Sequence, residues 1–313
     1  MAEQRTALVT GGAGFIGSNL VRHLCDQGWR VRVLDDLSGG DASRLADVVD
    51  PQDVLAASVT DAAACAQAVA GCDVVFHLAA KVSVVESMAE PFAYHAVNTG
   101  GTLTLLEAAR AAGVRAFVFS GTSAAYGDDP AQPKHEGMLP NPLSPYAVSK
   151  YAAERYVLAY ARLHGLHAVG LRYFNVYGPN QNPKSQYGAA VPAIVSRLLA
   201  NQRPTVYGDG EQTRDFVFVQ DVVRANLLAA ERPAAAGGVF NIGTGERISV
   251  NDLVRHATRL IGADLEPEYA PPRPGEVRDS LADISRAREH LSFAPQTDLA
   301  AGLAAYITYA RTL

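Results

Sequence analysis

The pair Tyr146 and Lys150 contains the side chains best placed in this sequence for acid–base chemistry. They lie four residues apart, after Ser144 as a suitable N-cap and Pro145 as a suitable first residue of a helix. Residues at this spacing share one helix face, so we expect the amine beside the phenol. A neighbouring ammonium favours the phenolate, which predicts a base that works near neutral pH. With 13 tyrosines in the chain such a pair can also arise by chance, so its context has to decide.

A glycine-rich loop near the N-terminus predicts a dinucleotide site. Residues 6–10 are typical of a short buried strand, and the string Gly11-Gly-Ala-Gly14-Phe-Ile-Gly17 follows before a helical pattern. Glycines at this spacing allow a tight turn and a close approach of a pyrophosphate to the helix N-terminus. The next strand, 30–35, ends at Asp35, where an acid accepts hydrogen bonds from ribose hydroxyls and repels a 2′-phosphate. This favours NAD over NADP, the alternative being an ordinary solvated strand end.

The remaining pattern predicts an α/β fold with a doubly wound parallel (Rossmann-type) sheet. Further strands are expected at 53–56, 73–79, 115–120 and 168–172, with helical stretches between them. Ligands of such sheets gather beyond the carboxyl ends of the strands. Residues 79–81 and 120–123 should therefore lie beside the cofactor, on the same edge as Tyr146.

Composition excludes several classes of protein. The 313 residues carry a net charge of −5 and no basic cluster, which argues against a nucleic-acid partner. No run of 18 apolar residues exists, so we expect no membrane span, and because the sequence goes straight into a strand we expect no signal peptide. Three scattered cysteines suggest a reducing, cytoplasmic location. We expect no metal, because His164 and His167 lack the further ligands of a metal site.

Eight strings together resemble the extended short-chain dehydrogenase/reductase family, and within it the nucleotide-sugar 4-epimerases, over nearly the whole chain. These strings are 11–17, 77–80, 98–102, 120–127, 146–150, 172–178, 208–215 and 273–278. The resemblance implies an NAD-binding Rossmann domain at 1–172 plus about 216–245. It also implies a smaller α/β substrate domain at about 173–215 plus 246–313.

The resemblance further implies a set of cofactor-binding residues. They are Gly11, Gly14, Phe15, Ile16, Gly17, Asp35, Asp36, Ser38, Gly39, Ser58, Val59, Leu78, Ala79, Ala80, Asn98, Tyr146, Lys150 and Tyr173. Ser58 stands where the family usually has an acid near adenine, so a looser adenine contact is expected there. Asn98 matches an asparagine that steadies a helix near the cofactor, a role that can be purely structural.

The mechanism implied by the resemblance centres on Tyr146, which takes the proton of the sugar 4-hydroxyl while C4 is oxidised by NAD. Lys150 lowers the tyrosine pKa and holds the nicotinamide ribose. The hydroxyl of Thr122, with Ser123 beside it, hydrogen-bonds the reacting oxygen; strand-end capping is the alternative role for both. The transient 4-keto sugar turns over in the site and is reduced on its other face, so NAD stays bound.

The implied substrate is a nucleoside diphosphate sugar, with uridine inferred from the resemblance. Arginine forks at Arg214 and Arg273 should bind the diphosphate together with Asn175. The full implied substrate set is Lys81, Ser83, Thr122, Ser123, Asn175, Val191, Tyr207, Arg214, Arg273 and Ser280. Epimerases restricted to glucose and galactose carry a bulky tyrosine seven residues after this second arginine, where Ser280 stands here. A small residue leaves room for an N-acetyl group, which predicts interconversion of UDP-GlcNAc and UDP-GalNAc, with UDP-Glc and UDP-Gal as slower substrates.

Two alternatives from other classes stay open. One is a dehydratase, decarboxylase or reductase acting on a nucleotide sugar; such relatives carry carboxylates where this chain has Ser123 and Ala124. The other is a non-catalytic NAD-binding sensor, which can lose the tyrosine–lysine pair that this chain keeps. A homodimer is expected through helices near 100–112 and 147–163, although their apolar spacing equally suits an internal core.

Overall fold

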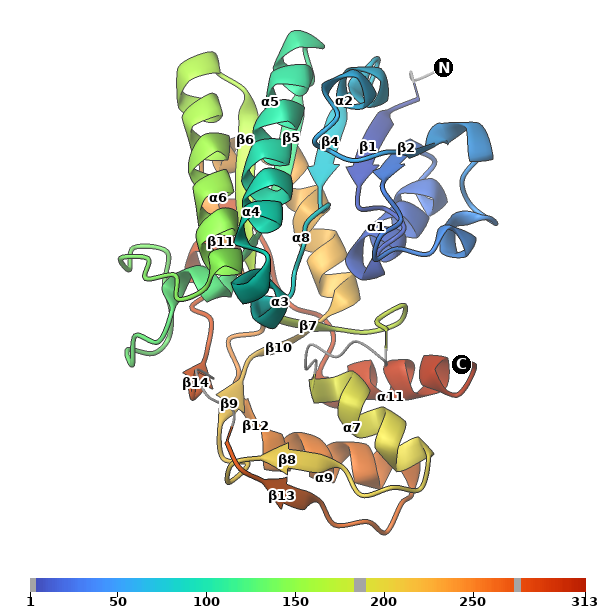
Figure 1. Ribbon diagram of the computed structural model, residues 1–313, viewed down its shortest axis with the longest axis vertical. Coiled ribbons are helices and arrows are strands. Elements are labelled where there is room, and N and C mark those ends of the chain that lie inside the picture. The colour runs from blue at the N-terminus through green and yellow to red at the C-terminus, as the bar shows by residue number, and fades with distance from the viewer. Residues whose placement is uncertain (1–3, 183–189, 273–276) are drawn as a thin grey trace.

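The computed structural model describes residues 4–182, 190–272 and 277–313, and its larger lobe is built on one seven-stranded parallel sheet (Figure 1). The strand order is β11-β6-β5-β4-β1-β2-β3. In chain order the strands are β1 (Thr6–Thr10), β2 (Arg30–Asp35), β3 (Val54–Ala56), β4 (Val74–His77), β5 (Ala116–Thr122), β6 (His167–Tyr173) and β11 (Val239–Ile242). The predicted doubly wound α/β fold is confirmed.

The point at which the strand order reverses lies at β1. This strand pairs in parallel with β2 on one side and with β4 on the other, so that Thr10 lies opposite both Leu34 and His77. Connections leave the carboxyl ends of β1 and β4 in opposite directions, and ligands of parallel sheets bind at such an edge. The glycine-rich loop follows β1 directly and therefore lies at that edge.

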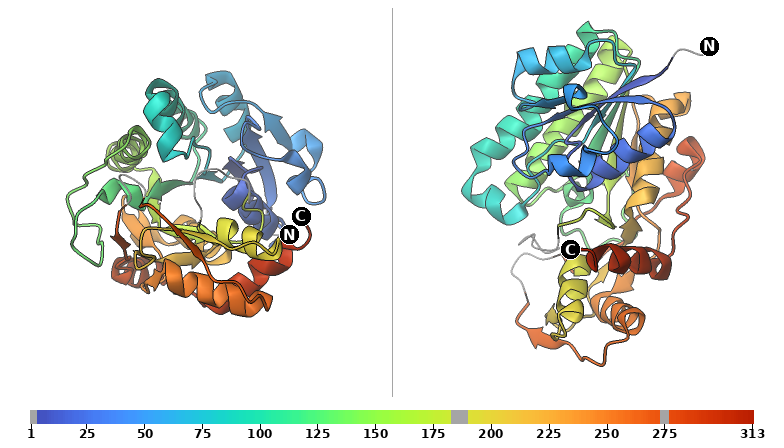
Figure 2. Two further views of the ribbon diagram at one scale, coloured as in Figure 1. Left: turned by 60° about the horizontal axis from the view of Figure 1, so that its bottom comes forward. Right: turned by 90° about the vertical axis from the view of Figure 1, so that its right-hand side faces the viewer.

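Helices cover both faces of the sheet, as the right-hand view of Figure 2 shows. One face is covered by α1 (Phe15–Asp26), α8 (Val219–Glu231) and α10 (Ser285–Leu291), and the other by α2 (Ala62–Val69), α5 (Thr102–Ala111) and α6 (Pro145–His164). The strands are buried on both sides, which is why their sequences are almost continuously apolar. Helix α5 continues a helix that starts as α4 (Pro91–Tyr94) and passes through a π-helical turn at His95–Gly101. The short helix α3 (Val84–Ala89) precedes it.

The smaller lobe has a core of its own below the sheet (Figure 1). It contains α7 (Ala190–Leu199), α9 (Val250–Ile261) and α11 (Leu299–Ala310). Two small sheets complete it: β8 (Thr205–Tyr207) with β13 (Glu268–Ala270), and β9 (Thr213–Arg214) between β12 (Ile248–Ser249) and β14 (Asp279–Ser280). Strand β7 (Asn175–Tyr177) pairs with β10 (Phe216–Phe218) where the chain crosses between the lobes.

The expected domain boundaries stay a prediction, and two segments pack across them. Within 246–313, which is expected in the substrate domain, Ala287, Leu291 and Phe293 belong to the same buried core as Phe240 of β11. The apolar face of α10 is therefore part of the larger lobe. Phe216 and Phe218 of β10, which are expected in the NAD-binding domain, belong to the core of the smaller lobe. Within the described ranges, every helix is too short or too polar to cross a lipid bilayer.

Candidate functional site

The loop after β1 forms a cradle that only glycine can build. Gly11 has φ +68, and a Cβ there would lie 2.7 Å from the backbone nitrogen of Ala79. A Cβ on Gly17 would lie 2.0 Å from the carbonyl oxygen of Gly11. Because the N-cap of α1 is Gly14, no side chain covers the first N–H groups of Phe15, Ile16 and Gly17. These free donors at a helix N-terminus fit the pyrophosphate of a dinucleotide.

A fourth glycine in the loop, Gly12, was not singled out from the sequence. A Cβ at Gly12 would lie 2.8 Å from the side chain of Val33 in β2. The spacing of Gly11, Gly14 and Gly17 predicts the glycines that would face a ligand. Gly12 instead allows the loop to pack on the sheet. Only the position of β2 reveals this role.

Asp35 holds the cradle from the end of β2. Its carboxylate is buried and accepts hydrogen bonds from the backbone N–H of Ala13 (2.9 Å) and of Leu37 (2.8 Å). Burial raises the pKa of Asp35, and these two donors oppose that shift. A solvated strand end is therefore excluded, because the carboxylate of Asp35 is buried and bonded to the glycine loop.

The neighbouring cofactor candidates lie along the same edge. Asp36 accepts hydrogen bonds from the backbone and hydroxyl of Ser38 in an exposed turn that continues to Gly39. The Ser58 hydroxyl is bonded to that of Thr60 (2.9 Å). Val59 is buried and packs where a Cβ on Gly101 would clash. Leu78, Ala79 and Ala80 follow β4, beside the cradle.

The catalytic candidates start helix α6 as expected. Ser144 caps the helix by accepting from the backbone N–H of Ala147 (3.2 Å), and Pro145 is its first residue. Lys150 is buried, with Nζ 4.3 Å from the ring centroid of Phe119. Burial lowers the pKa of Lys150 to about 7, opposed by the charge of Glu154.

The pKa of Tyr146 differs from the expectation. Desolvation of the phenol raises this pKa, and a hydrogen bond with Thr122 opposes the shift. Lys150 is not among the groups that shift this pKa in the structure, so the lowering expected from it is not seen, and removal of water from the phenol dominates.

Thr122 has the capping role, while its hydrogen bond to a reacting sugar oxygen stays a prediction. Its Oγ1 accepts from the backbone N–H of Ala124 (3.1 Å) and so caps the 3-10 turn Ser123–Tyr126. The same hydroxyl faces the phenol of Tyr146. Capping thus orients the hydroxyl toward the base, and Ser123 lies half-buried at the start of the turn.

Tyr94 is a neighbour of the candidate catalytic residue Tyr146 that sequence reasoning missed. Its ring meets that of Tyr146 edge-on, with centroids 6.5 Å apart. Its hydroxyl accepts from the backbone N–H of Ser83 (3.0 Å) and donates to Glu86 (2.8 Å). Ser83 is itself buried and caps α3, and Lys81 lies 3.5 Å from the carboxylate of Glu86. The polar atoms of Lys81 and Ser83 are thus engaged within the segment that supports Tyr94.

Two cofactor candidates have side chains turned away from a ligand. Both amide N–H groups of Asn98 are used, on the carbonyl of Lys81 (3.0 Å) and the hydroxyl of Ser149 (2.9 Å). Asn98 is therefore a positioning residue. The phenol of Tyr173 is buried in the core and donates to Asn226 of α8 (3.0 Å), which leaves its backbone at the end of β6 as the part that could contact a cofactor.

The substrate candidates of the smaller lobe gather on β9 and β14. Arg214 lies opposite Ser280 in the parallel register, and its Nη1 donates to the carbonyls of Thr213 and Arg278, both at 2.9 Å. Tyr207 ends β8, and Asn175 begins β7. Val191 is 1% exposed in the core of the smaller lobe, so the expected substrate contact is not open to it here. Arg273 lies outside the described residues.

Asp215, also missed from the sequence, ties this region together. Its buried carboxylate accepts four hydrogen bonds, from the N–H (2.7 Å) and hydroxyl (2.8 Å) of Thr244 and from the N–H of Gly245 (3.0 Å) and Ala282 (3.2 Å). It directly follows Arg214, and Ala282 lies two residues beyond Ser280. The acid that ends the 208–215 string was the available signal.

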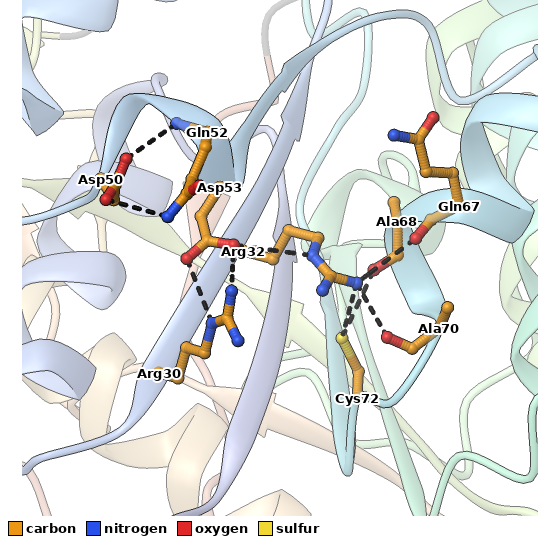
Figure 3. Close-up of polar contacts among 9 residues, drawn as sticks. All are labelled: Arg30, Arg32, Asp50, Gln52, Asp53, Gln67, Ala68, Ala70 and Cys72. Atoms are coloured by element: carbon orange, nitrogen blue, oxygen red, sulfur yellow. Dashed lines mark hydrogen bonds and ion pairs between the residues drawn. The ribbon is translucent and has the colours of Figure 1, made fainter.

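A hollow of about 250 Å³ lies at the amino end of β2 (Figure 3). Arg30 forms a bidentate ion pair with Asp53 there, with distances of 3.1 and 2.9 Å. Arg32 donates to the carbonyls of Ala68 (2.8 Å) and Ala70 (2.9 Å) at the end of α2. Its arginines bind the protein itself, and β2 separates it from the cradle at Asp35. It is therefore structural. No group of three His, Cys, Asp or Glu side chains in the described part of the chain could hold a metal.

Comparison with known proteins places these features in context. The model of the NAD dependent epimerase/dehydratase family matches residues 7–243. The chain is 44% identical over 309 residues to a UDP-glucose 4-epimerase of Mycolicibacterium smegmatis, covering 97% of this chain and 98% of that protein.

Solved structures agree over both lobes. A UDP-glucose 4-epimerase of Thermotoga maritima with UDP-glucose is 41% identical at a TM-score of 0.93, covering 98% of this chain and 99% of that one. A UDP-N-acetylglucosamine 4-epimerase of Methanobrevibacter ruminantium, in complex with UDP-N-acetylmuramic acid, is 35% identical at a TM-score of 0.94 and covers 99% of both chains.

Proposed function

Since this chain belongs to the NAD dependent epimerase/dehydratase family, we propose that it interconverts UDP-GlcNAc and UDP-GalNAc. At the coarser level the protein is an isomerase, an NAD-dependent 4-epimerase of UDP-sugars. UDP-Glc and UDP-Gal are slower substrates in this proposal. The observation that carries the choice of N-acetylated sugars is the small side chain of Ser280 beside Arg214.

Two features of the larger lobe support the binding of NAD. The Gly11–Gly17 cradle and the N-terminus of α1 would hold the pyrophosphate, and Asp35 would hold the adenosine ribose. When bound, NAD supplies the reversible oxidation of the sugar at C4. We assign the binding of NAD to residues 1–172 and about 216–245, with 285–293 packed against them. We assign the binding of the sugar nucleotide to the other residues.

The chain's own chemistry is proton transfer at the sugar 4-oxygen. Tyr146 takes that proton and later returns it, because its phenol lies at the start of α6 on the ligand edge of the sheet. Thr122 holds the phenol oxygen through its hydroxyl. The buried amine of Lys150 occupies the same helix face one turn on and holds the nicotinamide ribose.

In this proposal the diphosphate is bound by two arginine side chains and an asparagine amide. Arg214 and Arg273 provide the positive charge, and Asn175 a hydrogen-bond donor. The support for Arg214 is its fixed place on β9, where backbone carbonyls orient the guanidinium. Arg273 and Asn175 rest on the resemblance of their strings.

Dehydration of the sugar is disfavoured by the turn that faces the base. The turn Ser123–Tyr126 has alanine at 124 and serine at 123, so no carboxylate stands there for acid–base work at C5 and C6.

The proposal is tested by incubating the purified protein with UDP-GlcNAc, without added reductant, and resolving the products by NMR. UDP-GalNAc at a stable ratio is the expected result. Conversion of UDP-Glc to UDP-Gal alone would keep the isomerase and refute the argument from Ser280.

We place the enzyme in the cytoplasm as a homodimer. Cys65 and Cys72 are buried free thiols, which suits a reducing compartment. Val148, Tyr156 and Leu163 are exposed at helical spacing on α6, where a second α6 could cover them. Light scattering coupled to gel filtration at two concentrations tests the dimer.

A further inference from the structure

His77 is a completely buried histidine at the carboxyl end of β4, on the same edge of the sheet as the glycine cradle. Its Nδ1 lies 2.7 Å from Oγ1 of Thr10, and its Nε2 lies 2.9 Å from Oγ1 of Thr102. The two threonines belong to β1 and α5. A single imidazole thus joins the strand before the glycine cradle to the helix on the face that carries α6.

The direction of each hydrogen bond follows from the partners at the two ends. The hydroxyl of Thr102 lies 2.5 Å from the carbonyl of Asn98, which can only accept, so Thr102 donates there. Thr102 must then accept from Nε2–H of His77. The neutral ring leaves Nδ1 as an acceptor, so Thr10 donates to it, and Thr10 in turn accepts from the backbone N–H of Ala79 (3.2 Å).

Protonation of His77 would disrupt this arrangement of hydrogen-bond donors and acceptors. A proton on Nδ1 would force the buried Thr10 hydroxyl to accept from it, and the Thr10 proton would lose its acceptor. Burial, together with the charge of Lys150, lowers the pKa of His77 to about 3. His77 is therefore a fixed neutral tautomer, not a proton carrier.

The chain continues from Asn98 to the catalytic helix. The Asn98 amide donates to the hydroxyl of Ser149 (2.9 Å), and that hydroxyl donates to the carbonyl of Tyr146 (2.8 Å). The ring of Phe119 provides a second link, since its centroid lies 5.8 Å from that of His77 and 4.3 Å from Nζ of Lys150.

We propose that His77 is a positioning residue for the epimerase reaction: through Thr102 and Asn98 it sets the start of α6, and with it Tyr146, against the nucleotide cradle. The inference deepens the proposed function and rests on it for its kinetic readout. A hydrogen-exchange readout is independent of substrate.

The test compares Thr102→Val, which removes the hydroxyl, with Thr102→Ser, which keeps it. Thr104→Val is the matched control, because the Thr104 hydroxyl makes the same contact with a carbonyl four residues back, that of Gly100 (3.1 Å), on the same helix but receives no imidazole. In Thr102→Val we expect kcat to fall by about tenfold or more, with the KM for the UDP-sugar and the NAD content nearly unchanged. Thr102→Ser should recover most of kcat, and Thr104→Val should match the wild type.

Hydrogen–deuterium exchange of peptides covering 144–151 gives the second measurement. Faster exchange in Thr102→Val than in Thr104→Val is expected. His77→Phe should reproduce the Thr102→Val loss, and the double variant should be no worse than either single one, because the two residues act in one chain.

Equal losses in Thr102→Val and Thr104→Val, a change in KM alone, unchanged exchange at 144–151, or additive losses in the double variant would each overturn the proposal. If His77→Phe does not fold, the Thr102 pair still decides. A wild type inactive on UDP-sugars would refute the proposed function, while the exchange comparison would still test the coupling of Thr102 to α6.

Discussion

Ser280 lies directly opposite Arg214 in the parallel pairing of β14 with β9. Both strands are further joined through Asp215, which follows Arg214 and accepts the N–H of Ala282. The residue proposed to face the sugar and a residue proposed to bind the diphosphate are therefore held by one small sheet. A larger side chain at position 280 should therefore change which sugar is accepted, whereas binding of the diphosphate by Arg214 should stay the same.

Ser280→Tyr should convert the enzyme to a narrower substrate range. The phenol would fill the space proposed for the N-acetyl group, so kcat/KM for UDP-GlcNAc should fall by about 100-fold or more, while that for UDP-Glc changes little. Ser285→Tyr, at an exposed position that starts α10, is the matched control. Equal losses on both sugars would mean that Ser280 does not set the size of the site.

Tyr146→Phe should strongly reduce turnover and leave NAD bound. The change removes only the oxygen that accepts the proton, and kcat should fall by about 1,000-fold. Tyr156→Phe, exposed on the same helix, should keep full activity. NAD released on denaturation is measured for each protein, and a kcat of Tyr146→Phe close to that of the wild type would refute the role of Tyr146.

Gly17→Ala should lose NAD. Its Cβ would lie 2.0 Å from the carbonyl oxygen of Gly11, so the cradle must distort, at a cost of about 1–3 kcal/mol in the free energy of unfolding. Gly100→Ala is the control, because its Cβ would meet nothing closer than 3.9 Å. Cofactor content and urea midpoints of both variants check this, and a Gly17→Ala protein with a full complement of NAD would contradict it.

His77 should make the protein less stable in acid. Its pKa is lowered to about 3 in the folded state, below the ordinary value of 6.5, so between these values only the unfolded chain binds the proton. The free energy of unfolding should therefore fall as the pH drops from 6.5 toward 3, by about 1.4 kcal/mol per pH unit from this group. His77→Phe should show a slope smaller by this amount between pH 6 and 5, measured by urea denaturation. Identical slopes for the two proteins in that range would refute it; above pH 7.5 the slopes should agree.

Asp215→Asn should loosen the sheet that holds Arg214 and Ser280. The new amide would direct donors at N–H groups that now bond to the carboxylate, at a cost of about 3 kcal/mol or more. We expect a lower urea midpoint and a raised KM for the UDP-sugar. Asp209→Asn, which affects an exposed ion pair with Arg278, is the control and should change the free energy of unfolding by less than about 1 kcal/mol. An unchanged midpoint in Asp215→Asn would show that the hydrogen bonds of Asp215 contribute little.

The parts of this protein that depend on short-range chemistry were determined by the sequence itself. The cradle at Gly11–Gly17 needs only a strand, a turn without side chains and a helix, all within a few residues. The start of α6 at Ser144 and Pro145 depends likewise on local capping, and the spacing of Tyr146 and Lys150 then places them on one face.

Only the tertiary structure decided what surrounds those residues. The contact of Tyr94 with Tyr146, the chain from His77 to Asn98 and the carboxylate of Asp215 join segments far apart in sequence, and no local spacing records such contacts. Burial of Val191 and of the Tyr173 phenol depends in the same way on which elements pack against them. The pKa of Tyr146 was misjudged for a related reason: the sequence shows the neighbouring charge, whereas the removal of water that dominates the shift exists only once the chain has folded.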